Sequence, residues 1–155
     1  MANSHVAHNC IIGDHVILAN GALLAGHVTV QDRAFISGNC VIHQFCRIGT
    51  LAMLQGGAAV SQYAPPFTIV HNGLNRLCGL NVIGLRRAGF TAEQRLELKQ
   101  LYHFLFRGGK NFRAAVAEAQ TQFTSPGAQI MLDFVAASKR GVCADVGRKT
   151  ESEDE

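Results

Sequence analysis

The chain has 155 residues, of which 48% are hydrophobic, and it carries a formal net charge of +3. This length is typical of one domain or of one domain with an appendage, and the apolar content is sufficient for a core. No apolar run approaches the roughly 20 residues that span a bilayer, and no basic segment followed by an apolar one opens the chain. We therefore expect no membrane span, no signal peptide and no nucleic-acid partner.

A six-residue repeat runs through residues 2–64. Every sixth residue from Val6 to Val60 is aliphatic, and the residue four places after each of them is small or β-branched. A period of six fits neither an amphipathic helix nor a simple strand. It predicts a solenoid, in which each unit is a short strand plus a corner and three units form a coil of about 18 residues. Successive coils would then stack at strand spacing, about 4.8 Å.

The five cysteines are odd in number and show no C-x-x-C spacing. Three of them, Cys10, Cys40 and Cys46, occupy the small-residue positions of the repeat, where a free cysteine behaves as a small hydrophobe. We therefore expect reduced core cysteines, which are typical of a cytoplasmic protein.

The two ends of the repeat differ. A full repeat unit follows Met1 almost at once, so the first coil would present unpaired backbone groups, and edges of this kind are normally covered. We expect the sequence to start partway through a longer β-helix. Pro65 and Pro66 end the repeat, because proline removes a ladder donor. Residues 67–90 are interpreted as an irregular last coil and a crossing loop.

Three helices are predicted after the crossing loop. Thr91 is the expected N-cap of the first, which ends at Gly108. The second covers about Asn111 to Phe123, and the third opens at Ser125 and ends near Gly141. The overall prediction is an all-β solenoid followed by an α-helical region. We place the β-helix at 1–73, the crossing loop and helical domain at 74–141, and a disordered acidic tail at 142–155.

Several histidines of the repeat fall at one corner of the predicted solenoid. One coil length leads from His8 to Gly26, which precedes His27, and the next leads to Gln44, which follows His43. Histidine is the side chain that titrates near neutrality. Such a column could supply a general base for acyl transfer, with the Gly26 N–H holding the oxyanion. It could instead bind zinc and activate water, or simply form hydrogen bonds that stabilise the corner.

Several blocks of the sequence resemble one family. They are His5-Val6-Ala7-His8-Asn9-Cys10, Leu24-Ala25-Gly26-His27-Val28, Val41-Ile42-His43-Gln44-Phe45-Cys46, Pro65-Pro66-Phe67 and the stretch from Gly79 to Phe90. Together, and with their spacing, they resemble the UDP-N-acetylglucosamine O-acyltransferases, which catalyse the first step of lipid A biosynthesis. The hexapeptide repeat alone is less specific, because other transferases and carbonic anhydrases share it.

The resemblance implies a homotrimer of left-handed parallel β-helices, each followed by a C-terminal helical domain, with the active site between subunits. The enzyme would move a 3-hydroxyacyl chain from acyl carrier protein to the glucosamine 3-hydroxyl of UDP-N-acetylglucosamine. It would need no metal and no cofactor beyond the phosphopantetheine of the donor. Family members carry many more coils before the point where this chain begins.

The same resemblance assigns site residues. It makes His8 the general base and Gly26 the oxyanion donor. It places Gly56 where a side chain limits acyl length in the family, and because a glycine leaves room there, we expect a longer acyl chain to be accepted. The positions that it places at the substrate are His5, His27, His43, Gln44, Asn81, Arg86 and Arg87. Arginine suits a nucleotide because its guanidinium pairs with phosphate through two parallel hydrogen bonds. We expect the acidic carrier protein to dock on basic residues such as Arg107, Lys110 and Arg113.

Two other functions compete with the acyltransferase. One is a histidine–zinc enzyme of the carbonic anhydrase type on the same fold. It is weakened because Gly26 and Gln44, and not histidines, occupy the strict column at coil spacing. The other is a non-catalytic trimeric module that binds a carrier protein.

Overall fold

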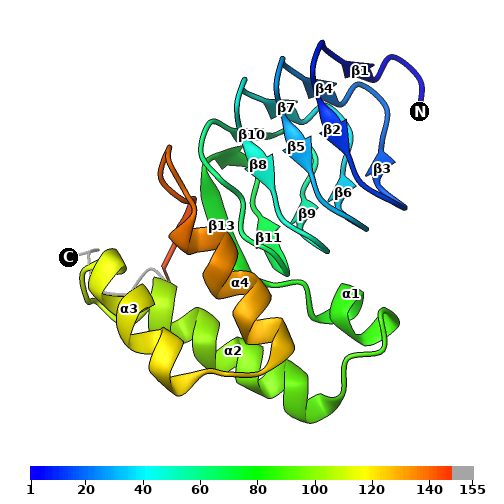
Figure 1. Cartoon of the computed structure of the whole chain (residues 1–155). Coiled ribbons are helices and arrows are strands. Elements are labelled where there is room, and N and C mark those ends of the chain that lie inside the picture. Colours follow the sequence, from blue (N-terminus) through cyan, green and yellow to red (C-terminus); the bar gives the residue numbers. More distant parts are fainter. Residues whose placement is uncertain (148–155) are drawn as a thin grey trace, which may run out of the picture.

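The computed structural model describes residues 1–147. Its N-terminal part is a stack of coils with three short strands in each turn, and a group of helices lies at one end of the stack (Figure 1). The strands of the repeat are β1 (His5–Val6), β2 (Ile11–Ile12), β3 (Ile17–Leu18), β4 (Leu23–Leu24), β5 (Thr29–Val30), β6 (Phe35–Ile36), β7 (Val41–Ile42), β8 (Arg47–Ile48), β9 (Met53–Leu54) and β10 (Ala58–Val60).

Strands from successive coils pair in parallel and form three faces. The first face has the order β1-β4-β7-β10-β12, in which β12 is Gly73–Leu74, and the second has β2-β5-β8. The third has the order β14-β13-β11-β9-β6-β3, in which β11 is Thr68–Val70, β13 is Arg76–Leu80 and β14 is Ala144–Asp145. His5 pairs with Leu23 and Leu23 pairs with Val41, so each strand lies beside the strand three repeat units further along the chain. The predicted solenoid and the length of its coil are confirmed.

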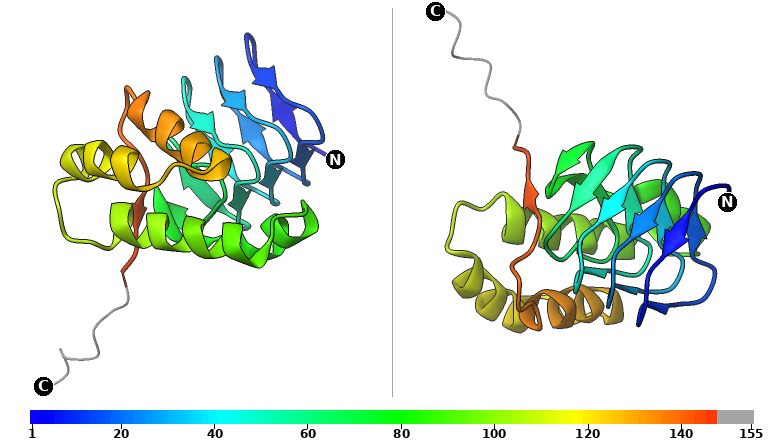
Figure 2. Two further views of the ribbon diagram at one scale, coloured as in Figure 1. Left: turned by 60° about the horizontal axis from the view of Figure 1, so that its bottom comes forward. Right: turned by 90° about the horizontal axis from the view of Figure 1, so that it is seen from above.

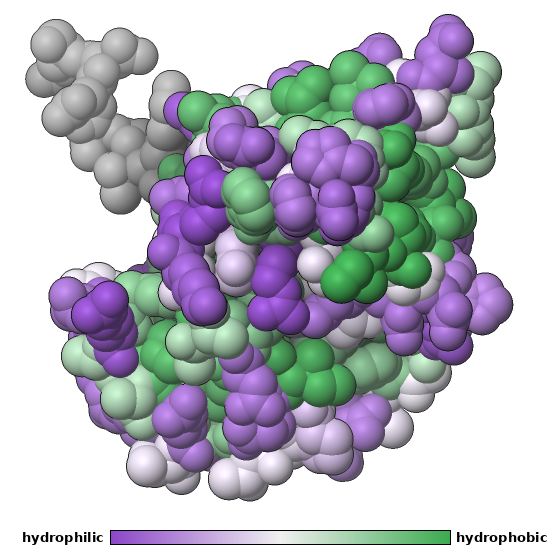
Figure 3. Space-filling view, turned by 45° about the horizontal axis from the view of Figure 1, so that its top comes forward, coloured by the Kyte–Doolittle hydropathy of each residue, from purple (hydrophilic) through white to green (hydrophobic). Residues whose placement is uncertain are grey.

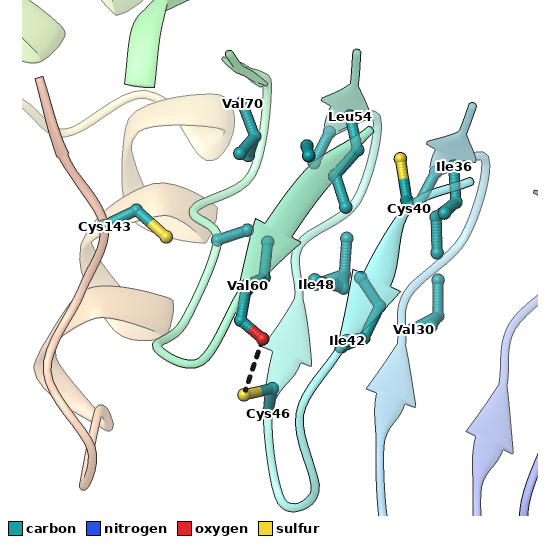
Figure 4. Close-up of a cluster of buried hydrophobic side chains, with 14 of the residues drawn as sticks. Val30, Ile36, Cys40, Ile42, Cys46, Ile48, Leu54, Val60, Val70 and Cys143 are labelled. Atoms are coloured by element: carbon teal, nitrogen blue, oxygen red, sulfur yellow. Dashed lines mark hydrogen bonds between the residues drawn. The ribbon is translucent and has the colours of Figure 1, made fainter. Parts of the chain in front are cut away.

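The two predicted registers of small and aliphatic residues fill the interior of the stack (Figure 4). Ile36, Ile48 and Leu54 are completely buried, and Cys40 and Cys46 lie among them. All five cysteines are free thiols, as predicted. Burial raises the pKa of the Cys46 thiol to about 11, so this side chain is a neutral core residue.

The segment after the repeat is more regular than the predicted crossing loop. Strand β11 (Thr68–Val70) continues the third face, and β13 (Arg76–Leu80) pairs antiparallel with it. Strand β12 (Gly73–Leu74) extends the first face, so the boundary predicted at residue 73 falls inside a coil. A short helix, α1 (Val82–Arg87), follows. The prolines end the six-residue period, but residues beyond them still pair with the preceding coil.

The three predicted helices are present as α2 (Ala92–Phe106), α3 (Phe112–Gln122) and α4 (Pro126–Ala136). Thr91 and Gln94 form a reciprocal capping box at the start of α2, because each side chain bonds the backbone N–H of the other. Helix α4 ends at Ala136, before the predicted end near Gly141. The helices bury a second apolar core that includes Leu98, Leu101, Met131 and Leu132. No helix within residues 1–147 has both the length and the apolar character that a membrane crossing requires.

The prediction of disorder from residue 142 is wrong for residues 142–147. Ala144–Asp145 form β14, which pairs in parallel with β13 beside the last coils (Figure 2). The Asp145 carboxylate accepts a hydrogen bond from Tyr102 Oη and lies 3.1 Å from Arg107 Nη2. These partners are distant in sequence, and so the local composition gave no sign of them. The rest of the predicted tail, 148–155, lies outside the described residues.

Candidate active site

The predicted histidine corner is present in the structure. His27 N donates to His8 O at 3.0 Å, and Phe45 N donates to Gly26 O at 3.1 Å. These backbone bonds stack the corners of three successive coils directly on one another. His8, Gly26 and His27 are therefore neighbours in space, although His8 is a full coil away from the other two in the sequence.

The His8 ring has one hydrogen-bond partner within residues 1–147, the side chain of Asn9. His8 Nδ1 lies 3.0 Å from Asn9 Oδ1. An amide oxygen only accepts hydrogen bonds, so Nδ1 carries the proton of the neutral ring and Nε2 keeps a free lone pair. Nε2 is therefore the atom that can take a proton. Sequence reasoning did not single out Asn9, although its position next to His8 was the available signal.

Gly26 lies directly against this ring. A Cβ placed on Gly26 would lie 2.7 Å from Cε1 and 2.8 Å from Nε2 of His8, closer than real side chains approach. Gly26 is buried, and within residues 1–147 its backbone N–H donates to no acceptor. The backbone N–H groups of Asp32 and Gln44 at other corner positions also donate to no acceptor within residues 1–147, so the feature that distinguishes Gly26 is its contact with the His8 ring. The corner therefore combines a base and an unpaired backbone donor at the same point, which is the arrangement that acyl transfer requires.

His27 is held between two other rings. It contacts the His8 ring edge-on, with ring centroids 5.1 Å apart, and it stacks on Phe45 at 4.7 Å and an interplanar angle of 14°. Both His27 and Phe45 have positive φ, at 59° and 63°. Sequence reasoning quoted Phe45 but gave it no role.

An apolar groove leaves this corner along the first face of the β-helix. It has a volume of about 610 Å³, and Gly26, His5 and His43 line it together with aliphatic residues. Ser61 also lines it, and its Oγ accepts a hydrogen bond from Asn75 Nδ2 at 2.7 Å. Ser61 was missed, although it follows His43 by one coil length and therefore stacks on it. The aliphatic lining residues are Leu23, Leu24, Val41, Ile42, Val60 and Leu74.

Gln44 takes part in the corner through its backbone. His43 Nδ1 lies 3.2 Å from Gln44 O, and the same oxygen accepts a hydrogen bond from Arg140 Nη1 at 2.9 Å. Arg140 therefore ties the segment after α4 to the histidine corner. Gln44 itself is exposed, and its side chain has no partner within residues 1–147.

Asn81 and Arg87 lie on a different face of the same chain. They line a second groove of about 950 Å³, between α1 and the third face, with Arg33, Phe35 and Met53. Asn81 Nδ2 donates to Leu51 O at 2.9 Å, and its Oδ1 accepts from Gly84 N at the start of α1. Asn81 thus caps a helix in this chain. The chain alone does not bring Asn81 and Arg87 to His8.

The two remaining candidates lie outside both grooves. Arg86 is exposed at the end of α1 and lines neither groove. Gly56 occupies an exposed corner, where an added Cβ would contact only Gly38 O, at an ordinary 3.6 Å. Within residues 1–147, no group of three or more histidine, cysteine or acidic side chains is arranged to hold a metal ion.

The sequence matches protein-family models and curated proteins. Residues 64–143 match the family described as UDP-N-acetylglucosamine O-acyltransferase, domain 2, and residues 1–26 match the bacterial transferase hexapeptide repeat. The chain is 41% identical over 143 residues to the acyl-[acyl-carrier-protein]–UDP-N-acetylglucosamine O-acyltransferase of Alkalilimnicola ehrlichii, covering 92% of this chain and 55% of that protein. The enzyme of the same name from Gloeothece citriformis is 40% identical, with 89% and 50% covered. The chain thus spans about half the length of the curated relatives that it matches.

Solved structures agree with these sequence matches. The UDP-N-acetylglucosamine acyltransferase of Francisella novicida superposes with a TM-score of 0.89 at 33% identity, covering all of this chain and 56% of that one. The corresponding protein from Arabidopsis superposes with a TM-score of 0.85 at 38% identity, with 90% and 52% covered. These neighbours are left-handed β-helices, and the predicted handedness of the solenoid is confirmed.

Proposed function

Because the chain belongs to the UDP-N-acetylglucosamine O-acyltransferase family, we propose that it transfers a 3-hydroxyacyl chain from acyl carrier protein to the glucosamine 3-hydroxyl of UDP-N-acetylglucosamine. This reaction would be the first step of lipid A biosynthesis. The observation that carries the proposal is the contact between the His8 ring and Gly26, a groove-lining residue whose backbone N–H has no acceptor within residues 1–147.

The reaction follows from the positions of these groups. His8 Nε2 takes the proton of the sugar hydroxyl, and the hydroxyl oxygen attacks the thioester carbonyl carbon at the same time. The Gly26 N–H stabilises the negative charge that develops on the carbonyl oxygen. The C–S bond then breaks, and the proton passes from His8 to the departing carrier thiol. No metal and no organic cofactor enters any step, apart from the phosphopantetheine that the donor carries.

The groove beside Gly26 suits the acyl chain. It is lined mainly by aliphatic residues, and it begins at the same corner as the proposed oxyanion site. An acyl chain in this groove would gain about 0.8 kcal/mol of favourable free energy for each methylene that it buries. His43 and Ser61 provide the polar groups along it. His5 lies at the end of the groove on the first coil.

A site shared between copies of the chain accounts for the two separate grooves. The acyl groove lies on the first face and His8 lies at the corner where this groove begins, whereas Asn81 and Arg87 line the groove beside the third face. Both faces expose apolar side chains, and Figure 3 shows apolar patches, interrupted by hydrophilic side chains, on the surface of the molecule. A homotrimer would place the third face of one copy against the first face of the next. Sedimentation equilibrium tests this arrangement, and a monomer at assay concentration would contradict it.

Two of the three basic residues that were predicted to dock acyl carrier protein are paired with carboxylates of this chain. Arg107 is paired with Asp145, and Lys110 Nζ lies 2.8 Å from Glu118 Oε2. Arg113 pairs with no carboxylate within residues 1–147 and is exposed, so it is the remaining candidate among the three. Replacing Arg113 by Glu should raise the KM for the carrier protein, and an unchanged KM would reject this surface.

The free thiols are in keeping with a cytoplasmic location.

The experiment that tests the function measures acyl transfer from carrier protein to the sugar nucleotide, with purified protein and product detection. His8→Ala should lower kcat by about 10²- to 10⁴-fold, the range for removing a general base. Gly26→Ala should also be nearly inactive, because its Cβ would collide with the His8 ring. Gln62→Ala, at the same corner but outside both grooves, is the matched control.

The outcomes separate the rival functions. An inactive intact protein that still binds carrier protein would favour the non-catalytic module. Stoichiometric zinc in the purified protein, together with loss of activity on chelation, would favour the histidine–zinc enzyme.

A further inference from the structure

The ring of the proposed base, His8, is the first of three neighbouring rings at the same corner of successive coils. His8 meets His27 edge-on at 5.1 Å, and His27 stacks on Phe45 at 4.7 Å with nearly parallel planes. The rings come from three successive coils, and backbone hydrogen bonds fix the spacing of those coils. Phe45 is thus linked to the base through one intermediate ring.

Surface exposure makes these ring contacts important. His8, His27 and Phe45 are all exposed, and Phe45 keeps 48% of its surface accessible. An exposed imidazole has a broad, weakly defined rotation about χ2. His8 has a single hydrogen bond, to the equally exposed Asn9, and no hydrogen bond of the His27 ring is present within residues 1–147. The stack on Phe45 and the edge contact with His8 are therefore the contacts that orient the His27 ring.

Core packing does not account for Phe45. The side chain is half exposed and belongs to neither apolar core. Its backbone φ of 63° is also unfavourable for a bulky residue, whereas asparagine tolerates it well, as Asn9 does at φ 58° on the same corner. Phenylalanine at this position therefore has a cost in backbone conformational free energy that asparagine would avoid. The stack on His27 is the favourable interaction that an aromatic ring makes at this position and that asparagine would lack.

We propose that Phe45 is a positioning residue for the general base. It holds the plane of His27 by stacking, and the edge of His27 then limits the rotation of the His8 ring about Gly26. With the ring fixed, Nε2 points at the position of the sugar hydroxyl in a larger fraction of molecules. This inference rests on the proposed acyltransferase function, because it assigns His8 the role of base. Phe45 itself touches neither substrate nor reacting atoms in this scheme.

The test replaces Phe45 by Asn in the full chain. Asn removes the ring but suits the positive φ, so the folded protein should be at least as stable as the wild type. We expect kcat to fall about 10-fold, equivalent to about 1.4 kcal/mol, with the KM of both substrates within twofold of wild type. Phe45→Tyr keeps the stack and should retain the wild-type kcat. Phe123→Leu removes a ring from the Phe104–Phe123 pair of the helical core and is the matched control, with unchanged kcat.

A second measurement does not depend on activity. In the wild type, stacking on Phe45 should move the NMR signals of the His27 ring protons upfield, and Phe45→Asn should abolish this shift and also move the His8 signals. A Phe45→Asn kcat within twofold of wild type, or unchanged His8 signals, would overturn the inference. An inactive wild-type protein would instead refute the proposed function, and the NMR comparison would still decide whether Phe45 orders the two histidines.

Discussion

The two ends of the β-helix obey the same sequence pattern but differ in burial. On the first coil, the register residues Val6 and Ile12 are 43% and 39% exposed. At the other end of the stack, Leu54 and Val60 in the same register are almost completely buried. A repeat unit buries its aliphatic side chain only between covered neighbours, so position in the stack sets burial as much as residue type does. The periodicity therefore identifies which residues point inward, but not how much each of them stabilises the fold.

The last coils owe their burial to segments that are not part of the repeat. Leu77 from β13, Tyr102 from α2 and Cys143 from the C-terminal segment join the same apolar core. Polar contacts hold them there: Ala144 N donates to Asn75 O at 3.1 Å, and Asp145 bonds Tyr102 and Arg107. This end is thus closed by long-range contacts. The comparison between the exposed and the closed end can be tested by several kinds of change.

The largest expected effect comes from shortening the same side chain in the two environments. Ile48 is completely buried, and Ile48→Ala should lower the free energy of unfolding by about 3–4 kcal/mol, through lost burial and a cavity. Ile12→Ala removes the same atoms from a partly exposed site and should cost about 1 kcal/mol or less. Denaturant unfolding at constant protein concentration measures both values. Equal losses would show that the first coil is covered in solution.

The next largest effect concerns the carboxylate that holds the closed end. The Asp145 side chain is 1% exposed and paired with Tyr102 and Arg107. Asp145→Asn should cost about 2–3 kcal/mol at pH 7, somewhat less than a fully buried pair, because Arg107 is one-third exposed. Glu118→Gln, which breaks the exposed pair with Lys110, is the matched control and should cost less than about 1 kcal/mol.

The Asp145 carboxylate should also make the free energy of unfolding depend on pH in the acid range. Burial alone would raise the pKa of Asp145, but its hydrogen bonds with Arg107 and Tyr102 outweigh that effect and leave the pKa below its usual range. A lowered pKa in the folded state stabilises the fold above the unfolded pKa, about 3.9, and this stabilisation is lost as the pH falls through the folded value. The difference in stability between wild type and Asp145→Asn should therefore shrink below pH 4. A difference that does not shrink as the pH falls from 4 to 2 would contradict this account.

The sequence allowed prediction of the parts of the molecule that depend on local repetition. The six-residue period gave the inward register and the coil length, and the step of one coil then brought His8, Gly26 and His27 together. The caps Thr91 and Ser125 gave the starts of two helices, because capping depends on residues a few places apart. The histidine corner needed no long-range information beyond the repeat.

Contacts between distant segments were not predictable in this way. Strand β14 pairs with β13 although the whole helical region separates them in the sequence, and Asp145 bonds Tyr102 of α2. No periodicity links such partners. The ring stack of His27 on Phe45 was within reach of the coil step, but nothing in the residue types indicated that the rings would be parallel. Ser61 was also within reach of the coil step from His43, but its hydrogen bond with Asn75 was not, because Asn75 lies beyond the repeat.

The smallest expected effect compares one thiol at each end of the stack. Cys10 lies at the exposed end and is partly buried, whereas Cys143 is buried at the closed end. Burial raises the pKa of Cys143 to about 12, so only about one molecule in 10⁴ carries its thiolate at pH 8. Under native conditions iodoacetamide should therefore modify Cys10 well before Cys143, as measured by peptide mass spectrometry.

The Asp145→Asn variant connects this measurement to the closed end. If Asp145 holds the C-terminal segment against β13, its loss should speed the modification of Cys143 through local opening, and leave the rate at Cys10 unchanged. Glu118→Gln should change neither rate. Faster modification of both cysteines would indicate global unfolding in place of local opening. An unchanged rate at Cys143 would show that the apolar contacts of this side chain, and not the carboxylate, keep the last coil covered.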